Sequence, residues 1–186
     1  MMRFVTCLLL LTFVANPATL GQGQSQDIEE LFAQLKHPSN IAVELARREP
    51  NLHEEPGDVN KPFEPGEKLY FRILLTNTSM HPIVVLVSNP YFQNRPKLLK
   101  EGQEIPYRNE KLDNLSEQID QSGGTDSVRL DPSVSSYVGH LNLSDWYAPL
   151  KAGRYELINR YRFVPKGDWL ESPPITFEVS REKRRQ

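Results

Sequence analysis

The stretch that most constrains the fold is Leu150–Leu157, which reads L-K-A-G-R-Y-E-L. Gly153 makes a turn two residues before Tyr155, and alternating apolar residues then continue to Phe163. This pattern is typical of a tyrosine corner, in which the hydroxyl of a tyrosine near the start of a strand donates a hydrogen bond to backbone a few residues upstream. The octapeptide therefore predicts a strand that enters a β-sandwich through a fixed corner, with Gly153 and Tyr155 as structural residues.

Alternation of apolar and polar residues predicts further strands along the chain. The predicted strands are 41–46, 69–75, 83–87, 98–107 (a strand or a hairpin through Gly102), 127–130, 138–143, 154–163 and 175–179. The run 83–87 is continuously apolar, which predicts a strand deep in the sandwich, whereas 89–96 and 164–174 are interpreted as loops. We expect an all-β fold, an immunoglobulin-like antiparallel β-sandwich with a short N-terminal helix.

The first residues predict export from the cytoplasm. Arg3 precedes an apolar run over residues 4–14, and small residues follow it. This run is shorter than the roughly 20 residues of a membrane span, so residues 1–21 are predicted to be a secretory signal peptide. The protein is then secreted or periplasmic, with no stable membrane span after cleavage. Cys7, the only cysteine, leaves with the leader, so the mature chain has no disulfide.

Between the leader and the sandwich, residues 22–40 are predicted to be a spacer and a short helix. Asp27 and Glu30 form a helix-start signature, and Pro38 ends the helix. Four apolar residues share one face of it: Ile28, Leu31, Phe32 and Leu35. The predicted sandwich domain spans 41–180, with a polar excursion over 109–125, and a basic tail follows at 181–186.

Two segments together resemble a known group of domains. They are Pro65–Ser79, with the pattern P-G-E-x-L-x-F-x-I-x-L-x-N-x-S, and the octapeptide Leu150–Leu157. They are similar to bacterial extracytoplasmic immunoglobulin-like domains, a broad group that includes BsuPI-type proteinase-inhibitor domains. The resemblance covers residues 41–180 and implies an interaction role, with proteinase inhibition as one variant. The Cys…Trp…Cys core of antibody domains is missing.

The sequence offers no pattern of residues for catalysis or for binding a metal ion. None of the four histidines stands in a two-histidine motif, and no G-x-S-x-G elbow is present. Asp58, Asn60 and Glu64 supply too few oxygens for calcium, so an Asx-type turn is favoured. A net charge of −2 gives no basic face for nucleic acid. We therefore expect no enzyme, no cofactor and no metal site; a hydrolase is only a third alternative.

Three asparagines stand in N-x-S sequons, which are acceptors for N-glycosylation only in a eukaryotic secretory pathway. They are Asn77, Asn114 and Asn142. Because the leader and the absence of disulfides indicate a bacterial envelope protein, we interpret these sequons as chance or as turn chemistry.

Aromatic residues in the predicted loops are the candidate partner-binding residues, because exposed Trp and Tyr dominate protein interfaces. They are Tyr91, Phe92, Trp146, Tyr147 and Trp169. Loops gather at the ends of a sandwich, which predicts that Tyr91 and Trp169 share an end. The favoured function is binding of a protein partner through loops or a sheet edge; the alternative is binding of a polysaccharide. A purely structural role, in which Trp146 and Trp169 cover the open ends of the core, is the other interpretation.

Arg154, Arg160 and Arg162 fall on one face of the strand that begins at the corner. They form either a basic stripe for a partner or cross-strand pairs with acidic neighbours such as Glu156 and Glu178. We expect the pairing, because antiparallel sheets stabilise opposite charges on neighbouring strands.

Overall fold

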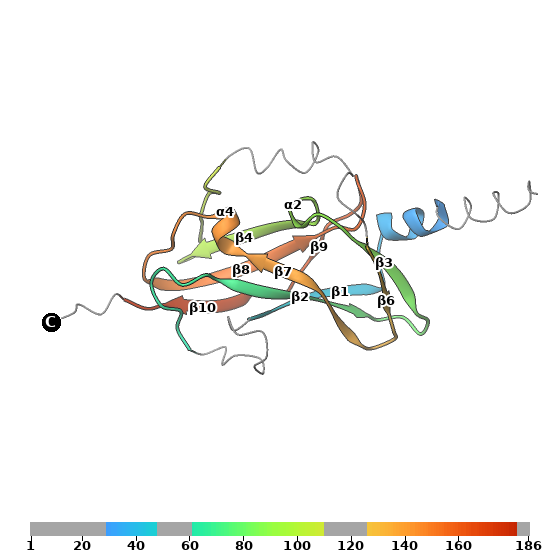
Figure 1. Cartoon of the computed structure of the whole chain (residues 1–186), viewed down its shortest axis with the longest axis horizontal. Coiled ribbons are helices and arrows are strands. Elements are labelled where there is room, and N and C mark those ends of the chain that lie inside the picture. Colours follow the sequence, from blue (N-terminus) through green and yellow to red (C-terminus); the bar gives the residue numbers. More distant parts are fainter. Residues whose placement is uncertain (1–28, 48–60, 110–125, 182–186) are drawn as a thin grey trace, which may run out of the picture.

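The computed structural model describes residues 29–47, 61–109 and 126–181, which form two antiparallel sheets packed on each other (Figure 1). One sheet has the order β1-β2-β7, with strands β1 (Ile41–Arg47), β2 (Tyr70–Asn77) and β7 (Ser135–Asn142). The other has the order β10-β8-β4-β5, with strands β4 (Asn94–Lys100), β5 (Gln103–Glu104), β8 (Gly153–Tyr161) and β10 (Ile175–Val179). The short β9 (Leu170–Glu171) pairs with the end of β8. The predicted all-β, immunoglobulin-like sandwich is confirmed.

The core lies between the sheets because one face of each long strand is apolar. In β2, Phe71, Ile73 and Leu75 are buried while the residues between them are partly exposed. β8 shows the same alternation. Phe63, before β2, packs its ring on Phe71 and Phe177, with centroids 6.1 and 5.6 Å apart. This aromatic cluster joins the two sheets, since Phe71 belongs to one and Phe177 to the other.

The strand beside β8 in the second sheet is β4, not the apolar run 83–87. β4 begins inside the segment 89–96 that was predicted to be a loop, so that prediction was wrong. Pro96 lies within the strand, and a proline normally argues against a sheet position. It is tolerated here because β5 pairs only with the last two residues of β4. On that side of β4, Pro96 has no neighbouring strand in the described part of the chain, so its missing N–H removes no hydrogen bond between strands.

The run 83–87 forms β3 (Ile83–Val87), which pairs with β6 (Asp126–Leu130) as a separate two-stranded arm. Val85 is fully buried, but its neighbour Val84 is 42 % exposed. The prediction that this run lies deep in the sandwich was therefore wrong. One face of the arm rests on the body of the protein and the other faces solvent, although the sequence is apolar on both.

Asn77 joins this arm to the end of β2. Its Nδ2 donates to the carbonyl oxygens of His81 and Leu130 at 2.8 and 3.0 Å. Its Oδ1 accepts from the N–H and the hydroxyl of Ser79 at 2.9 and 2.8 Å. Because Asn77 is fully buried, these bonds satisfy groups that would otherwise be costly to bury. The nitrogen that a glycan would need is thus occupied inside the fold.

Two single-turn helices, α2 (Pro90–Gln93) and α4 (Leu143–Trp146), lie on the same side of the sandwich (Figure 1). Each begins at an asparagine N-cap. Asn89 Oδ1 accepts from the N–H of Tyr91 at 2.9 Å, and Asn142 Oδ1 accepts from the N–H of Ser144 at 3.2 Å. These caps stabilise turns too short to show helical periodicity in the sequence, which is why neither helix was predicted.

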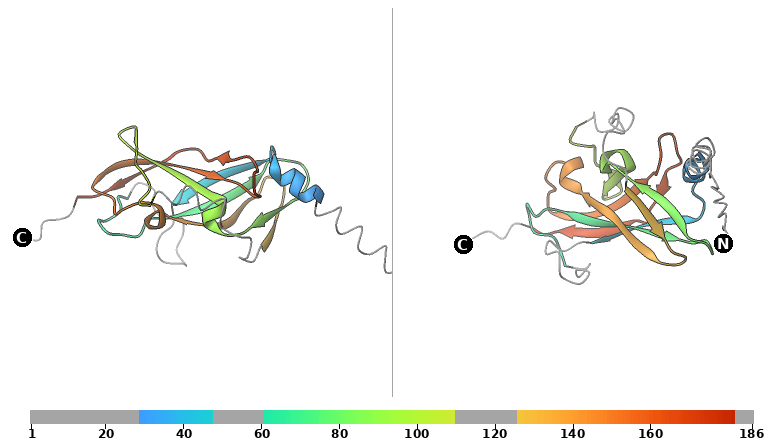
Figure 2. Two further views of the ribbon diagram at one scale, coloured as in Figure 1. Left: turned by 90° about the horizontal axis from the view of Figure 1, so that it is seen from above. Right: turned by 45° about the vertical axis from the view of Figure 1, so that its right-hand side comes forward.

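Residues 29–36 form the short N-terminal helix, which lies beside the segment that follows β8 (Figure 2). The carbonyl oxygen of Lys36 accepts from the N–H of Asp168 at 2.8 Å. On the predicted apolar face, Leu35 is buried but Phe32 is 41 % exposed, so the helix packs through its last turn rather than along the whole stripe. No helix in the described part of the chain is long and apolar enough to cross a membrane.

Several predictions fall outside the described residues. They are the signal peptide at 1–21, the helix start at Asp27, the Asx-type turn at Asp58 and Asn60, nearly all of the excursion 109–125, and the basic tail beyond 181.

Candidate functional site

Tyr155 has the contacts of a tyrosine corner. Its hydroxyl donates to the carbonyl oxygen of Lys151 at 2.5 Å, and its ring stacks on Phe177 at a centroid distance of 5.4 Å. Gly153 has φ +148°, in a region that L side chains rarely adopt. The side chain of Lys100 crosses this turn, with Nζ donating to the carbonyl oxygen of Ala152 at 3.1 Å. These residues fix the entry of β8.

Trp146 and Tyr147 are both 2 % exposed, so neither presents a surface to a partner. The Trp146 ring packs on Tyr91 and Tyr107, with centroids 5.6 and 5.4 Å apart. Both Tyr107 and Tyr147 donate their hydroxyl to the carbonyl oxygen of Pro96 at 2.7 Å. These rings pack α4 against the strand β4. Their assignment as candidate partner-binding residues is corrected: they are part of the core.

Trp169 lies half-buried in the segment between β8 and β9, where three guanidinium groups surround its indole. The Cζ of Arg162 is 4.6 Å from the ring centroid, and those of Arg95 and Arg160 are each 5.8 Å away. Arg162 also lies over the ring of Phe92 at 4.5 Å. We call Trp169, Phe92, Arg160 and Arg162 the Trp169 patch. The structure thus brings the segment 91–92 and Trp169 together at one end of the molecule.

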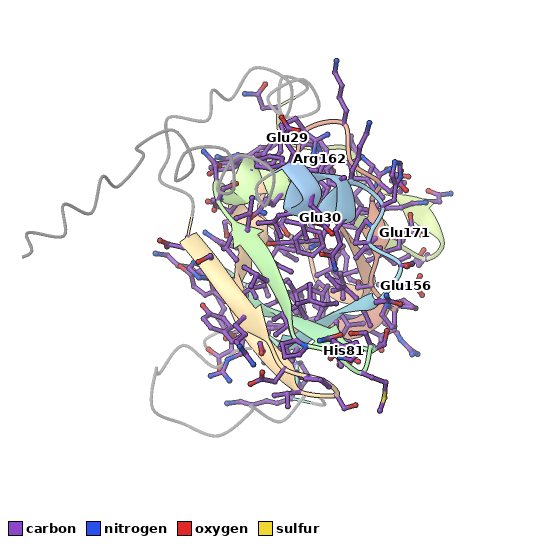
Figure 3. All side chains as sticks on the ribbon, turned by 90° about the vertical axis from the view of Figure 1, so that its right-hand side faces the viewer. Glu29, Glu30, His81, Glu156, Arg162 and Glu171 are labelled. Atoms are coloured by element: carbon purple, nitrogen blue, oxygen red, sulfur yellow. The ribbon has the colours of Figure 1, made fainter. Side chains whose placement is uncertain are left out.

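Arg162, which is labelled in Figure 3, is the centre of this patch and bonds to α2. Its backbone N–H donates to the carbonyl oxygen of Gln93 at 3.0 Å, and its Nε donates to that of Phe92 at 3.3 Å. Only 8 % of its surface is exposed, although the alternation of the strand predicted an outward residue. β8 ends at Tyr161, so the alternation stops before Arg162 and the chain turns this side chain under Trp169.

The other two arginines of β8 remain in the strand. Arg154 stands opposite Glu178 on β10, as the expected pairing requires, and Arg160 stands opposite Glu171 on β9. Neither arginine has a guanidinium nitrogen within 4.0 Å of a carboxylate oxygen of a described residue. Arg160 instead lies over Trp169, and its Nε is buried without a hydrogen-bond partner among the described residues. The positive charge at this end is therefore concentrated around the indole.

A buried layer of amides lies beneath the patch. Gln93 Oε1 accepts from the hydroxyl of Tyr161 at 3.1 Å and from the N–H of Ser88 at 2.7 Å. Asn159 Nδ2 donates to Asn94 Oδ1 at 2.7 Å. Burial raises the pKa of the Tyr161 hydroxyl above its ordinary value, because the charged form would lose its hydration. This layer fixes α2 to β8, and it holds the patch in one geometry.

Four residues of this end were not identified from the sequence. They are Gln93, Asn94, Arg95 and Asn159, all of them buried. Gln93, Asn94 and Arg95 directly follow the two aromatic residues of α2. Three polar residues beside two candidate binding residues could have indicated that this segment belongs to the site. They were not selected because the segment was interpreted as a solvated loop.

The remaining candidate groups are dispersed over the described residues. His37 Nδ1 lies 2.8 Å from Asp168 Oδ2, and both side chains are exposed. In the described ranges, no three His, Cys, Asp or Glu side chains are grouped as a metal site would require. Asn142 uses its side chain to cap α4, and Asn114 lies outside the described residues.

Comparisons with known proteins give no family for this chain. No protein-family model matches it, and no curated protein matches it. Among solved structures, it is similar to the CARDB domain of the PF1109 protein from Pyrococcus furiosus, which was solved in complex with di-metal ions. The identity is 9 %, the TM-score is 0.34, and the match covers 77 % of this chain and 94 % of that domain.

Proposed function

We propose that the protein is an exported, non-enzymatic interaction module that binds a protein partner through the Trp169 patch. The observation that carries the proposal is the convergence of Arg160 and Arg162 on the half-buried indole of Trp169, with Phe92 beside them. Trp and Arg are the residue types that most often dominate the binding energy of protein interfaces. Here they lie on a rigid support, which lowers the entropy lost on binding.

The contacts of Trp169 favour a protein over a polysaccharide. A sugar ring stacks on a free aromatic face, whereas guanidinium groups already lie over this indole at 4.6 and 5.8 Å. Trp146, the second ring that the polysaccharide alternative needs, is buried. The carbohydrate alternative therefore has less support than it had from the sequence.

The charge of the patch suggests the chemistry of the partner. The positive charges of the partly exposed Arg160 and the buried Arg162 favour an acidic surface, since complementary charges steer association and fix register. A proteinase as the partner is a narrower form of the proposal, supported by the resemblance of residues 65–79 and 150–157 to extracytoplasmic immunoglobulin-like domains. The signal-peptide pattern of residues 1–21 supports a partner in the cell envelope or outside it.

The test is capture of partners from the native cell envelope by the mature chain, with Trp169→Ala as the variant and Tyr137→Ala as the matched control. Tyr137 is 53 % exposed on β7, outside the Trp169 patch. We expect one protein to be recovered by the wild type and by Tyr137→Ala. Trp169→Ala should weaken its binding by at least about 30-fold, the equivalent of about 2 kcal/mol.

Equal capture by all three proteins would contradict the proposal, provided that circular dichroism shows each variant to be folded. Tryptophan fluorescence titrated with soluble polysaccharides tests the alternative, which predicts quenching that Trp169→Ala abolishes. A proteinase panel with no inhibition would remove the narrower proposal and leave the broader one to the capture experiment.

A further inference from the structure

A small cavity lies at the opposite end of the sandwich from the Trp169 patch. Its volume is about 260 Å³, which is below the usual range for drug-sized ligands. Its lining residues include Glu64, Gly66 and Glu67, together with Arg108 and the segment 147–150. It lies at the corner end, because its lining residue Val179 stands opposite Gly153 in the sheet. This site is independent of the proposed function.

The two acidic residues that line the cavity belong to a tight turn. The N–H of Glu67 donates to the carbonyl oxygen of Glu64 at 3.1 Å, and Glu67 Oε2 accepts from the N–H of Glu64 at 2.8 Å. Gly66 has φ +80°, which suits the third position of a type II turn, with Pro65 before it. The turn therefore places Glu64 and Glu67 beside the cavity, and a hydrogen bond holds the carboxylate of Glu67.

The segments that carry Arg108 and Leu143 are also held by backbone hydrogen bonds. The N–H of Arg108 donates to the carbonyl oxygen of Trp146 at 2.8 Å, which ties this residue to α4. The N–H of Leu143 donates to the carbonyl oxygen of Leu69 at 3.0 Å, which ties α4 to the start of β2. These hydrogen bonds fix the backbone of the segments that line the cavity.

Part of the cavity lining is apolar. It consists of core side chains that are almost fully buried, together with the half-buried Leu150; the core members are Leu69, Leu143, Tyr147 and Val179. The lining also includes residues of opposite charge, Glu64 and Glu67 with carboxyl groups and Arg108 with a guanidinium group. A lining that combines apolar, acidic and basic side chains is complementary to a small molecule with three parts: an apolar group, an ammonium and a carboxylate.

We propose that this cavity binds a free α-amino acid with an apolar side chain. The side chain packs on Leu69 and Leu143. The α-ammonium faces the carboxylates of Glu64 and Glu67, and the α-carboxylate faces Arg108, whose planar guanidinium suits a bidentate contact. The volume of about 260 Å³ admits a ligand the size of leucine or phenylalanine and excludes a folded peptide.

The test is titration of the mature protein with L-leucine and L-phenylalanine, followed by NMR shifts of the Leu69 and Leu143 methyl groups and by calorimetry. N-acetyl-leucine removes the ammonium, leucinamide removes the carboxylate, and glycine removes the apolar group. The variants are Glu64→Gln and Arg108→Gln, with Arg154→Gln as the control because Arg154 is an exposed residue that does not line this cavity.

We expect saturable shifts with leucine or phenylalanine, and weaker binding by about tenfold or more for each blocked ligand and each cavity variant, since each of them removes one of the contacts that hold the ligand. The control should bind as the wild type does. Either of two results overturns the proposal: no shifts at millimolar leucine and phenylalanine, or equal binding of leucine, N-acetyl-leucine and leucinamide, which would show only apolar adsorption. Neither result bears on capture through Trp169.

Discussion

The two ends of β8 differ in the side chains that they bury. At its start, Tyr155 stacks on Phe177 and sends its single polar group to the carbonyl oxygen of Lys151. At its end, Asn159 and Tyr161 point into the same interior, but they meet other polar groups at 2.7 and 3.1 Å. The first end is an apolar corner, and the second is a buried layer of amides beneath a group of arginines.

The difference shows which end was built for stability. Burying an amide or a guanidinium costs free energy unless every polar atom finds a partner. Asn159 Oδ1 has no hydrogen-bond partner among the described residues, so this layer is not optimised for stability. The polar end instead fixes α2 to β8, and the binding surface that we propose at Trp169 rests on this support.

The strongest test of this comparison is Gln93→Ala at the polar end. The change removes the acceptor of Tyr161 and Ser88 and the donor to the carbonyl oxygen of Leu86. Because several buried groups lose their partner, we expect the free energy of unfolding to fall by about 3 kcal/mol or more. Urea denaturation measures this, with Gln103→Ala on exposed β5 as the control that should change little. A loss below about 1 kcal/mol would mean that water replaces the amide layer.

The second test replaces each of two glycines by alanine, in separate variants, because the two differ in backbone conformation. At Gly153, φ is +148° and an added Cβ would lie 2.8 Å from Cε of Lys100, whereas at Gly139 nothing lies within 4 Å. We expect Gly153→Ala to cost about 2 kcal/mol. Gly139→Ala should be neutral or stabilise by up to about 1 kcal/mol, since alanine restricts the unfolded chain. Thermal unfolding compares the two variants. Equal melting temperatures would show that the corner does not depend on Gly153.

The corner end could be predicted from the sequence because its signals are local. Gly153, Tyr155 and the alternation after them lie within a few residues, and each has a conformational reason that does not depend on distant parts of the chain. β1, β2 and β10 were predicted with similar success, since alternation reports directly on one buried face. The bounds of β1 and β2 differ from the predicted ones by one or two residues, and those of β10 agree.

The polar end could not be predicted in the same way because its residues depend on tertiary partners. Gln93 and Asn94 are buried only because β8 brings Tyr161 and Asn159 against them, from more than sixty positions away. The run 83–87 misled for the opposite reason: its apolar residues indicated burial on both faces, whereas the arm buries only one. Which strand lies beside β8 is decided by pairing register, and neither composition nor alternation reports it.

The third test, at the corner itself, is the one for which we expect the smallest change in stability. Tyr155→Phe keeps the ring on Phe177 and removes only the hydroxyl that bonds the carbonyl oxygen of Lys151. We expect a loss of about 1 to 2 kcal/mol in the free energy of unfolding, the cost of leaving one partly buried acceptor without its partner. Tyr137→Phe, on an exposed ring, is the matched control and should stay within about 0.5 kcal/mol of wild type. If both variants unfold like the wild type, the corner is held by the packing of the Tyr155 ring and by the backbone of Gly153, and its hydrogen bond contributes nothing measurable.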